Sequence, residues 1–158
     1  MNLFNIRKHK KSGEIVAICT GNIYPIENVN DDVFSKKILG DGTAFEITGN
    51  QIVSLVDGVI DSIFPGGHAY NIVSDDNIPL MIHIGLDTVN LNGEGFDVKV
   101  TGKQRVKKGQ ILCIVDTEFL KSKNSDFPIM LVNLDQKRKI TFYDLEKVEE
   151  GSTIIGCY

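Results

Sequence analysis

Residues 79–89 read Pro79-Leu80-Met81-Ile82-His83-Ile84-Gly85-Leu86-Asp87-Thr88-Val89, a run too hydrophobic for a loop, with a histidine at its centre. Counted from Ile78, every even-numbered residue of the run up to Leu86 is aliphatic. The side chains of a strand alternate between its two faces. The run is therefore predicted to be a strand with an aliphatic inner face and an outer face that carries His83 and Asp87.

A second apolar run, residues 68–73, lies upstream and is joined to the first by Ser74-Asp75-Asp76-Asn77, a composition typical of a turn. The two runs are predicted to form a hairpin. If the turn is symmetric about its middle bond, His68 lies directly opposite His83. Directly opposed residues share a face, with Cβ atoms roughly 4.5 to 5.5 Å apart, so we expect the two imidazoles side by side on an exposed face.

This pairing gives the histidines a chemistry that one strand histidine lacks. A neutral imidazole is a nucleophile near pH 7, and a second imidazole nearby disfavours double protonation, so one ring stays nucleophilic. The second ring can also donate a hydrogen bond to a transferred anionic group. A histidine on a strand is often structural, but two of only three histidines placed opposite each other favour a functional site.

Residues 79–89, with the Asn92-Gly93-Glu94-Gly95-Phe96 that follows, resemble the active-site signature of the glucose-type IIA components of the bacterial phosphoenolpyruvate-dependent sugar phosphotransferase system. The similarity covers roughly residues 20–135. Its other matching segments are Ile26-Glu27, Val33-Phe34, Gly40-Asp41-Gly42, Val56-Asp57-Gly58, Phe64-Pro65, His68-Ala69 and Val106-Lys107-Lys108-Gly109-Gln110. The resemblance implies a duplicated fold, a hybrid of barrel and sandwich.

The resemblance also implies a role for each residue of the candidate site. His83 corresponds to the histidine that accepts a phosphoryl group from the phosphohistidine of the carrier HPr and passes it to a cysteine of a IIB domain. His68 corresponds to the second histidine, which supports the phosphate, and Asp87 to an aspartate beside the site. The chain departs from the family pattern at Gly66, where the family commonly has a threonine whose hydroxyl would orient the second histidine.

We expect the partner surface to be a small apolar patch around the histidines, because a relay must bind HPr and a IIB domain in turn and release each quickly. The hairpin register sets Gly66 opposite Gly85, and the two missing side chains would leave His83 open to the donor. Gly85→Glu is therefore expected to block transfer from HPr without unfolding the domain. The predicted rim of the patch consists of Phe64, Met81 and Val89.

Composition bounds the remaining possibilities. A chain of 158 residues with 42% hydrophobic content forms one core, and we predict a single IIA domain over residues 13–158. A net charge of −4 argues against a nucleic-acid partner. Cys19, Cys113 and Cys157 are odd in number and contain no Cys-x-x-Cys motif, which indicates reduced thiols. We expect a cytoplasmic monomer that works transiently at the inner face of the membrane.

Residues 1–12 are predicted to be a flexible basic arm, with Leu3, Phe4 and Ile6 followed by the cluster Arg7-Lys8-His9-Lys10-Lys11. This order is the reverse of a signal peptide, and no segment of the chain approaches the roughly 20 apolar residues that span a bilayer. Two interpretations stay open: a solvated tail, or weak attachment to an anionic membrane surface. Proteins that the chain resembles do carry a membrane-touching arm.

The whole pattern predicts an all-β fold, an antiparallel β-sandwich. From Gly13 onward turn signals recur at intervals of roughly seven to ten residues, and short β-branched runs lie between them. Only residues 30–39, with Val33, Phe34 and Ile38 as apolar set, and residues 117–123 are predicted to be helical, both as short connectors.

Two other functions are compatible with a histidine pair. A zinc-dependent peptidase of similar fold would use both histidines as ligands, but a catalytic zinc site takes three protein ligands, and the remaining histidine, His9, lies in the arm. A regulatory module that no longer transfers phosphate would fit Gly66, with zinc held by His68, His83 and a partner's carboxylate. We expect no required cofactor, and the sequence does not name the sugar.

Overall fold

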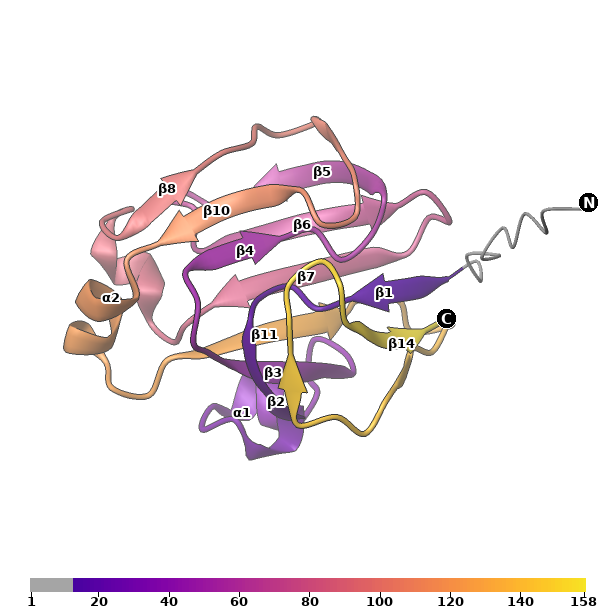
Figure 1. The fold of residues 1–158 in the computed structure, drawn as a ribbon, viewed down its shortest axis with the longest axis horizontal. Coiled ribbons are helices and arrows are strands. Elements are labelled where there is room, and N and C mark those ends of the chain that lie inside the picture. Colours follow the sequence, from indigo (N-terminus) through magenta and orange to yellow (C-terminus); the bar gives the residue numbers. More distant parts are fainter. Residues whose placement is uncertain (1–12) are drawn as a thin grey trace, which may run out of the picture.

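The computed structural model describes residues 13–158, so the predicted arm, with His9, lies outside the described residues. Two α-helices, two 3-10 helices and fourteen strands occur in this part of the chain (Figure 1). The helices are η1 (Ile26–Asn28), α1 (Asp32–Ser35), η2 (Thr88–Leu91) and α2 (Thr117–Lys123). The strands are β1 (Glu14–Val16), β2 (Gly21–Pro25), β3 (Gly42–Ile47), β4 (Gln51–Val53), β5 (Gly58–Ile63), β6 (Ala69–Ser74), β7 (Pro79–Ile84), β8 (Phe96–Val98), β9 (Arg105–Val106), β10 (Ile111–Val115), β11 (Pro128–Asn133), β12 (Thr141–Phe142), β13 (Lys147–Val148) and β14 (Ile154–Cys157).

These strands form three antiparallel sheets. The largest has eight strands in the order β13-β2-β3-β11-β7-β6-β5-β9, and the two others have the orders β1-β14-β12 and β4-β10-β8. Apolar residues of all three sheets meet in one core, among them Ile15, Phe45, Ile52, Ile82 and Leu112. The prediction of an all-β antiparallel sandwich with short connecting helices is confirmed.

The central strands of the large sheet are buried on both faces, which the alternation of residues 79–89 did not predict. A second apolar cluster, named here the α1 cluster, lies on the outer face and consists of Ile26, Val29, Phe34, Ala44, Met81, Leu86, Met130 and Val132. It forms because α1 and η1 cover this part of β3, β7 and β11. Met81 is consequently only 8% exposed, and the expectation that it forms an exposed rim is wrong.

The predicted pairing of β6 with β7 is correct, but its register is wrong by one residue. Ala69, not His68, is the partner of His83, and Val73 is the partner of Pro79. The turn closes with Asn77 in the left-handed conformation at φ 62°, so it is a three-residue loop between Ser74 and Ile78 instead of a symmetric two-residue one. Asparagine is one of the few non-glycine residues that tolerate this conformation.

The two predicted helices are present, one shorter than expected. α2 has the predicted bounds, whereas α1 covers only Asp32–Ser35 of the predicted range 30–39. Its N-cap is Asp31, whose side chain accepts a hydrogen bond from the Val33 N–H at 2.9 Å. Lys37 then takes a positive φ of 55° and ends the segment, which leaves Ile38 61% exposed.

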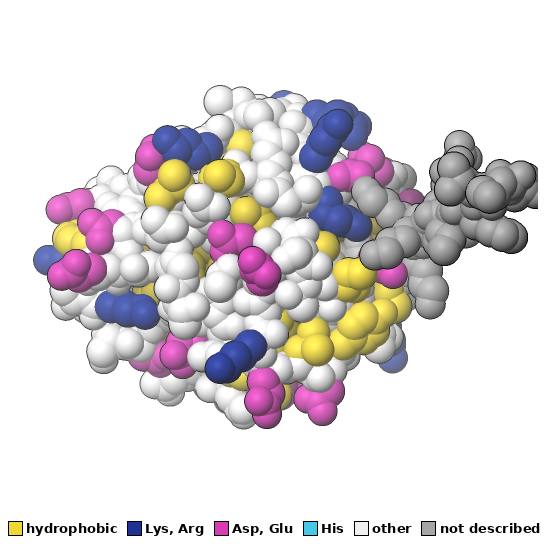
Figure 2. All heavy atoms as spheres, in the orientation of Figure 1, with side chains coloured by type: hydrophobic (Ala, Val, Ile, Leu, Met, Phe, Trp, Pro, Cys, Tyr) yellow, Lys and Arg dark blue, Asp and Glu magenta, His cyan; other side chains and the backbone are white. Residues whose placement is uncertain are grey.

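The face drawn in Figure 2 shows acidic and basic side chains interspersed, with apolar side chains gathered near the carboxyl terminus. Several of the basic side chains are paired with carboxylates, such as Lys103 with Asp61 and Arg105 with Asp75. In the range 13–158 no helix is both long enough and apolar enough to cross a membrane.

Candidate functional site

His83 lies near the end of β7, where the strand gives way to a tight turn. Its Nδ1 atom is 2.8 Å from the carbonyl oxygen of Gly85, two residues further on. A carbonyl oxygen can only accept a hydrogen bond, so this geometry places the imidazole proton on Nδ1. Nε2 of the neutral ring therefore keeps its lone pair, and Nε2 is the nitrogen able to act as a nucleophile.

His68 lies immediately before β6, after the turn Phe64-Pro65-Gly66-Gly67. Its Nδ1 is 3.2 Å from the carbonyl oxygen of Pro65, so the same argument leaves Nε2 as its free nitrogen. The side chain is only 4% exposed, which contradicts the expectation that both histidines lie on an exposed face. A ring fixed in this way is suited to support a group bound to its neighbour.

The two imidazoles are neighbours, as predicted, although their residues are not opposed in the strand pairing. Their ring centroids are 5.5 Å apart and their planes are inclined by 77°. The Ile84 N–H donates to the His68 carbonyl oxygen at 2.7 Å, which holds the two backbones together at this level. Because His68 follows two glycines with positive φ, 89° at Gly66 and 84° at Gly67, its position does not depend on regular strand alternation.

Burial is the main influence on the protonation of His83. Desolvation lowers its pKa below the ordinary value, the neighbouring His68 lowers it further, and the hydrogen bond to Gly85 together with Asp31 and Asp87 opposes the shift. The net effect is a lowered pKa. The ring is thus held in the neutral, nucleophilic form at neutral pH.

This lowered pKa predicts a pH dependence of stability. Below about pH 6.5, the ordinary histidine value, the unfolded chain binds a proton at residue 83 that the folded chain does not yet bind. The contribution of His83 to the free energy of unfolding is therefore fully present above that pH and decreases as the pH falls below it. In urea titrations, the unfolding free energy of wild type minus that of His83→Gln should be constant above pH 7 and decrease between pH 6.5 and 5.5. A difference that increases on acidification would contradict the lowered pKa.

His83 borders an apolar depression of about 390 Å³. The Phe34 ring packs on His83 with centroids 5.1 Å apart, and the Phe64 ring contacts His68 edge-on at 5.7 Å. The residues that line the depression are Asp31, Val33, Phe34, Leu39, Phe64, Met81, His83, Leu86, Asp87, Thr88 and Val89. It offers one reactive nitrogen in mostly apolar surroundings, with Asp31 and Asp87 as its charged groups.

Most of the residues predicted from the sequence meet in this depression. Asp87 and the apolar residues Phe64 and Val89 line it with exposed side chains, whereas Met81 lines it from a largely buried position. Gly66 and Gly85 do not line it. Gly66 is exposed but Gly85 is buried, so the two glycines do not form the shared open approach that the sequence predicted.

Gly85 is enclosed instead of open. A Cβ atom added to it would lie 2.5 Å from Phe127 and 2.6 Å from Thr88, and its φ is 75°. The glycine is needed for the turn that brings its carbonyl oxygen to His83. Its role is structural support of the site, not access to it.

Gly66 is likewise determined by the backbone. With φ at 89° it occupies the third position of the turn that begins at Phe64, where glycine is favoured after proline. An added Cβ would lie 2.8 Å from the backbone nitrogen of Gly93. The Pro65 carbonyl orients His68, so the site anchors this ring without the threonine hydroxyl of the family pattern.

Several residues of the site, among them Phe34 and Asp31, were not predicted from the sequence as site residues. Phe34 was assigned to a connecting helix and to a segment that resembles the family, without a role in the site, yet it packs on His83. Asp31, the N-cap of α1, lies at the same depression. A signal was available in the sequence, because Val33-Phe34 is one of the segments that resemble the family.

Among residues 13–158 no group of three or more His, Cys, Asp or Glu side chains is arranged to hold a metal ion. The site has two histidines, whereas a catalytic zinc site takes three protein ligands. The described part of the chain thus gives no support to the zinc peptidase alternative.

Fold and site together define the class: an all-β sandwich domain that presents an anchored pair of imidazoles beside an apolar depression. The sequence profile of the phosphoenolpyruvate-dependent sugar phosphotransferase system EIIA 1 family matches residues 13–139. The chain therefore belongs to this family, and it is a IIA component of the sugar phosphotransferase system.

Individual relatives agree with this assignment. The chain is 44% identical over 142 residues to the PTS system glucose-specific EIIA component of Buchnera aphidicola, covering 89% of this chain and 88% of the relative. It is 38% identical over 146 residues to the component of the same name in Staphylococcus aureus, covering 91% and 88%. The solved structure of glucose permease IIA from Mycoplasma capricolum matches with a TM-score of 0.86 at 29% identity, over 90% of this chain and 93% of the other.

Proposed function

We propose that the protein accepts a phosphoryl group on Nε2 of His83 from phosphorylated HPr and passes it to a cysteine of a IIB domain. The observation that carries this proposal is that a backbone carbonyl oxygen holds each imidazole through Nδ1, which leaves the Nε2 lone pair of each ring free. Phosphoryl transfer between positioned nucleophiles depends mainly on alignment and on stabilisation of the oxygen charges. Two imidazoles held in fixed positions can supply both the alignment and the stabilisation of charge.

In the accepting step, the Nε2 lone pair of His83 attacks phosphorus while the phosphorus–nitrogen bond to the donor imidazole breaks. The electron pair of that bond returns to the donor ring, which is protonated on its other nitrogen and leaves as neutral imidazole. His83 keeps its Nδ1 proton on the Gly85 carbonyl. His68, held through Nδ1 by the Pro65 carbonyl, accepts on Nε2 a hydrogen bond from the hydroxyl of the monoanionic phosphoryl group, and this bond stabilises the transferred group.

In the onward step, the thiolate of the IIB cysteine attacks the same phosphorus and neutral His83 leaves. This scheme requires no metal or organic cofactor.

The names of the relatives, which call them glucose-specific, support glucose as the sugar. We further propose a monomeric domain over residues 13–158 that works in the cytoplasm, with no nucleic-acid partner; the membrane contact of the basic arm stays a prediction.

Incubation of the full chain with phosphoenolpyruvate, enzyme I and HPr, followed by intact mass measurement, tests the proposal. We expect one added phosphoryl group that is lost in acid, and its transfer to a glucose-type IIB domain added afterwards. If HPr becomes phosphorylated and the chain gains no mass, the proposal is wrong.

The apolar depression is proposed as the surface on which HPr and the IIB domain dock in turn. Val89 lines it and is 54% exposed, so Val89→Glu should leave the fold intact. A carboxylate there would be buried without a partner in the complex, and the rate of transfer from HPr should fall at least about tenfold.

Ile154→Glu is the matched control for this prediction. Ile154 is also an exposed aliphatic residue, 40% exposed, but it lies on β14 and does not line the depression. Its substitution should leave the rate unchanged. Equal rates for the wild type and Val89→Glu, measured by quenched-flow phosphorylation, would show that the partners dock elsewhere.

A further inference from the structure

The hydrogen bond from His83 to Gly85 depends on the orientation of one peptide group. Gly85 is in the left-handed region at φ 75°, and with this backbone its carbonyl oxygen lies 2.8 Å from Nδ1 of a residue two positions earlier. A change in the preceding peptide would turn the carbonyl away. The contacts that hold the peptide between Ile84 and Gly85 therefore determine which nitrogen of His83 carries the proton.

The peptide between Ile84 and Gly85 is held at both of its polar atoms. Its oxygen, that of Ile84, accepts a hydrogen bond from the Thr88 hydroxyl at 2.5 Å. Its N–H, that of Gly85, donates to the carbonyl oxygen of Pro128 at 2.8 Å. The second bond comes from the backbone of β11, so the Thr88 hydroxyl is the side-chain contribution to this arrangement.

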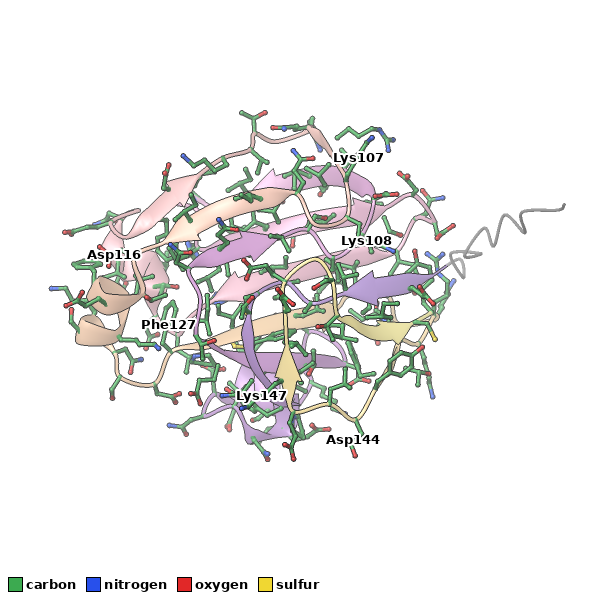
Figure 3. The ribbon with its side chains drawn as sticks, viewed as in Figure 1. Lys107, Lys108, Asp116, Phe127, Asp144 and Lys147 are labelled. Atoms are coloured by element: carbon green, nitrogen blue, oxygen red, sulfur yellow. The ribbon has the colours of Figure 1, made fainter. Side chains whose placement is uncertain are left out.

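Thr88 is well placed for this task, because its hydroxyl donates to the Ile84 carbonyl while the residue also lines the depression. It is 5% exposed, and its Cγ2 and the ring of Phe127 both lie close to the position that a Cβ atom of Gly85 would take. Phe127, labelled in Figure 3, comes from the segment between α2 and β11. Asp87, at φ 58°, turns the chain so that the first residue of η2 points back at Ile84.

We propose that Thr88 is a positioning residue that fixes the tautomer of His83. Its hydroxyl holds the Ile84–Gly85 peptide, the Gly85 carbonyl then takes the Nδ1 proton, and Nε2 remains free for phosphorus. The proposal deepens the proposed function and rests on it for the identity of the reaction. The tautomer itself is a property of the isolated protein and can be measured without any partner.

The test uses the full chain labelled with ¹⁵N and histidine ring correlation spectra at pH 7.5, with the His83 signals assigned from the His83→Gln variant. In the wild type we expect the proton of His83 on Nδ1. In Thr88→Val, which keeps the shape but loses the hydroxyl, an Nε2-protonated population should appear. The rate of phosphoryl acceptance from HPr should fall roughly fivefold to tenfold, the effect of losing one hydrogen bond.

Thr88→Ser, which keeps the hydroxyl, should restore both the tautomer and most of the rate. Thr43→Val is the matched control, because Thr43 is also 5% exposed and donates to a backbone carbonyl, that of Tyr24 at 3.1 Å. It should cost stability without moving the His83 signals. Thr88→Ala serves as a second hydroxyl-free variant if the valine variant does not fold.

Three results would overturn the proposal: a wild-type His83 protonated on Nε2, a Thr88→Val or Thr88→Ala spectrum with the wild-type tautomer, or a Thr88→Ser variant as impaired as Thr88→Val. Failure of the proposed function gives a different outcome. In that case the wild type gains no phosphoryl group, while the tautomer and its dependence on Thr88 are still observed.

Discussion

We expect the His83→Gln variant to take up no phosphoryl group from HPr, whereas His68→Gln takes one up and fails to pass it on. Glutamine has no nucleophilic nitrogen, so at position 83 it removes the acceptor itself. At position 68 it leaves Nε2 of His83 free. It also removes the ring that we propose stabilises the phosphoryl charge at 5.5 Å centroid separation.

Intact mass after incubation with phosphoenolpyruvate, enzyme I and HPr measures the first step for each variant, and addition of a IIB domain measures the second. Both variants should remain folded by circular dichroism, which serves as the control. A stable phosphoryl label on His83→Gln would show that the acceptor has been misassigned. Wild-type onward transfer by His68→Gln would remove the proposed role of His68.

Gly85→Glu should unfold or strongly destabilise the domain, and even Gly85→Ala should lower the free energy of unfolding by at least about 2 kcal/mol. A Cβ atom there would lie 2.5 Å from Phe127 and 2.6 Å from Thr88, with φ at 75°. The substitution therefore combines backbone strain with overpacking. This corrects the expectation from the sequence that Gly85→Glu blocks docking in an intact fold.

Gly102→Ala is the control, because nothing lies within 4 Å of an added Cβ at that position and its φ is not in the left-handed region. Its unfolding free energy should stay within about 0.5 kcal/mol of the wild type. Urea titrations of the three proteins measure the differences. A Gly85→Ala variant as stable as the wild type would show that Phe127 and Thr88 leave more room around Gly85 than the structure describes.

The strand 79–84 and its hairpin with residues 69–74 could be predicted because local pattern determines them. The aliphatic alternation from Ile78 to Ile84 requires a buried face, and all four of its even-numbered residues are 0% exposed. The helix 117–123 was predictable for a similar reason, since its cap Asp116 immediately precedes it and its apolar residues lie within it.

The register of the hairpin could not be read from the same residues. A turn of composition Ser-Asp-Asp-Asn is compatible with two loop lengths, and the left-handed conformation of Asn77 selects one of them only in the folded sheet. The shift of one residue did not separate the histidines, because His68 lies outside β6, beyond two glycines with positive φ. The prediction of neighbouring imidazoles was thus correct in distance and wrong in its stated cause.

The sequence by itself determined the all-β class, the strand that carries His83 and the choice of both histidines as candidates, because periodicity and turn composition are local properties. Tertiary structure decided which atoms of those histidines are free, through the carbonyls of Pro65 and Gly85. It also decided that Phe34 packs on His83 and that Gly85 is enclosed by Phe127 and Thr88. These contacts join segments far apart in the chain or depend on backbone angles, and neither is encoded in the alternation of neighbouring residues.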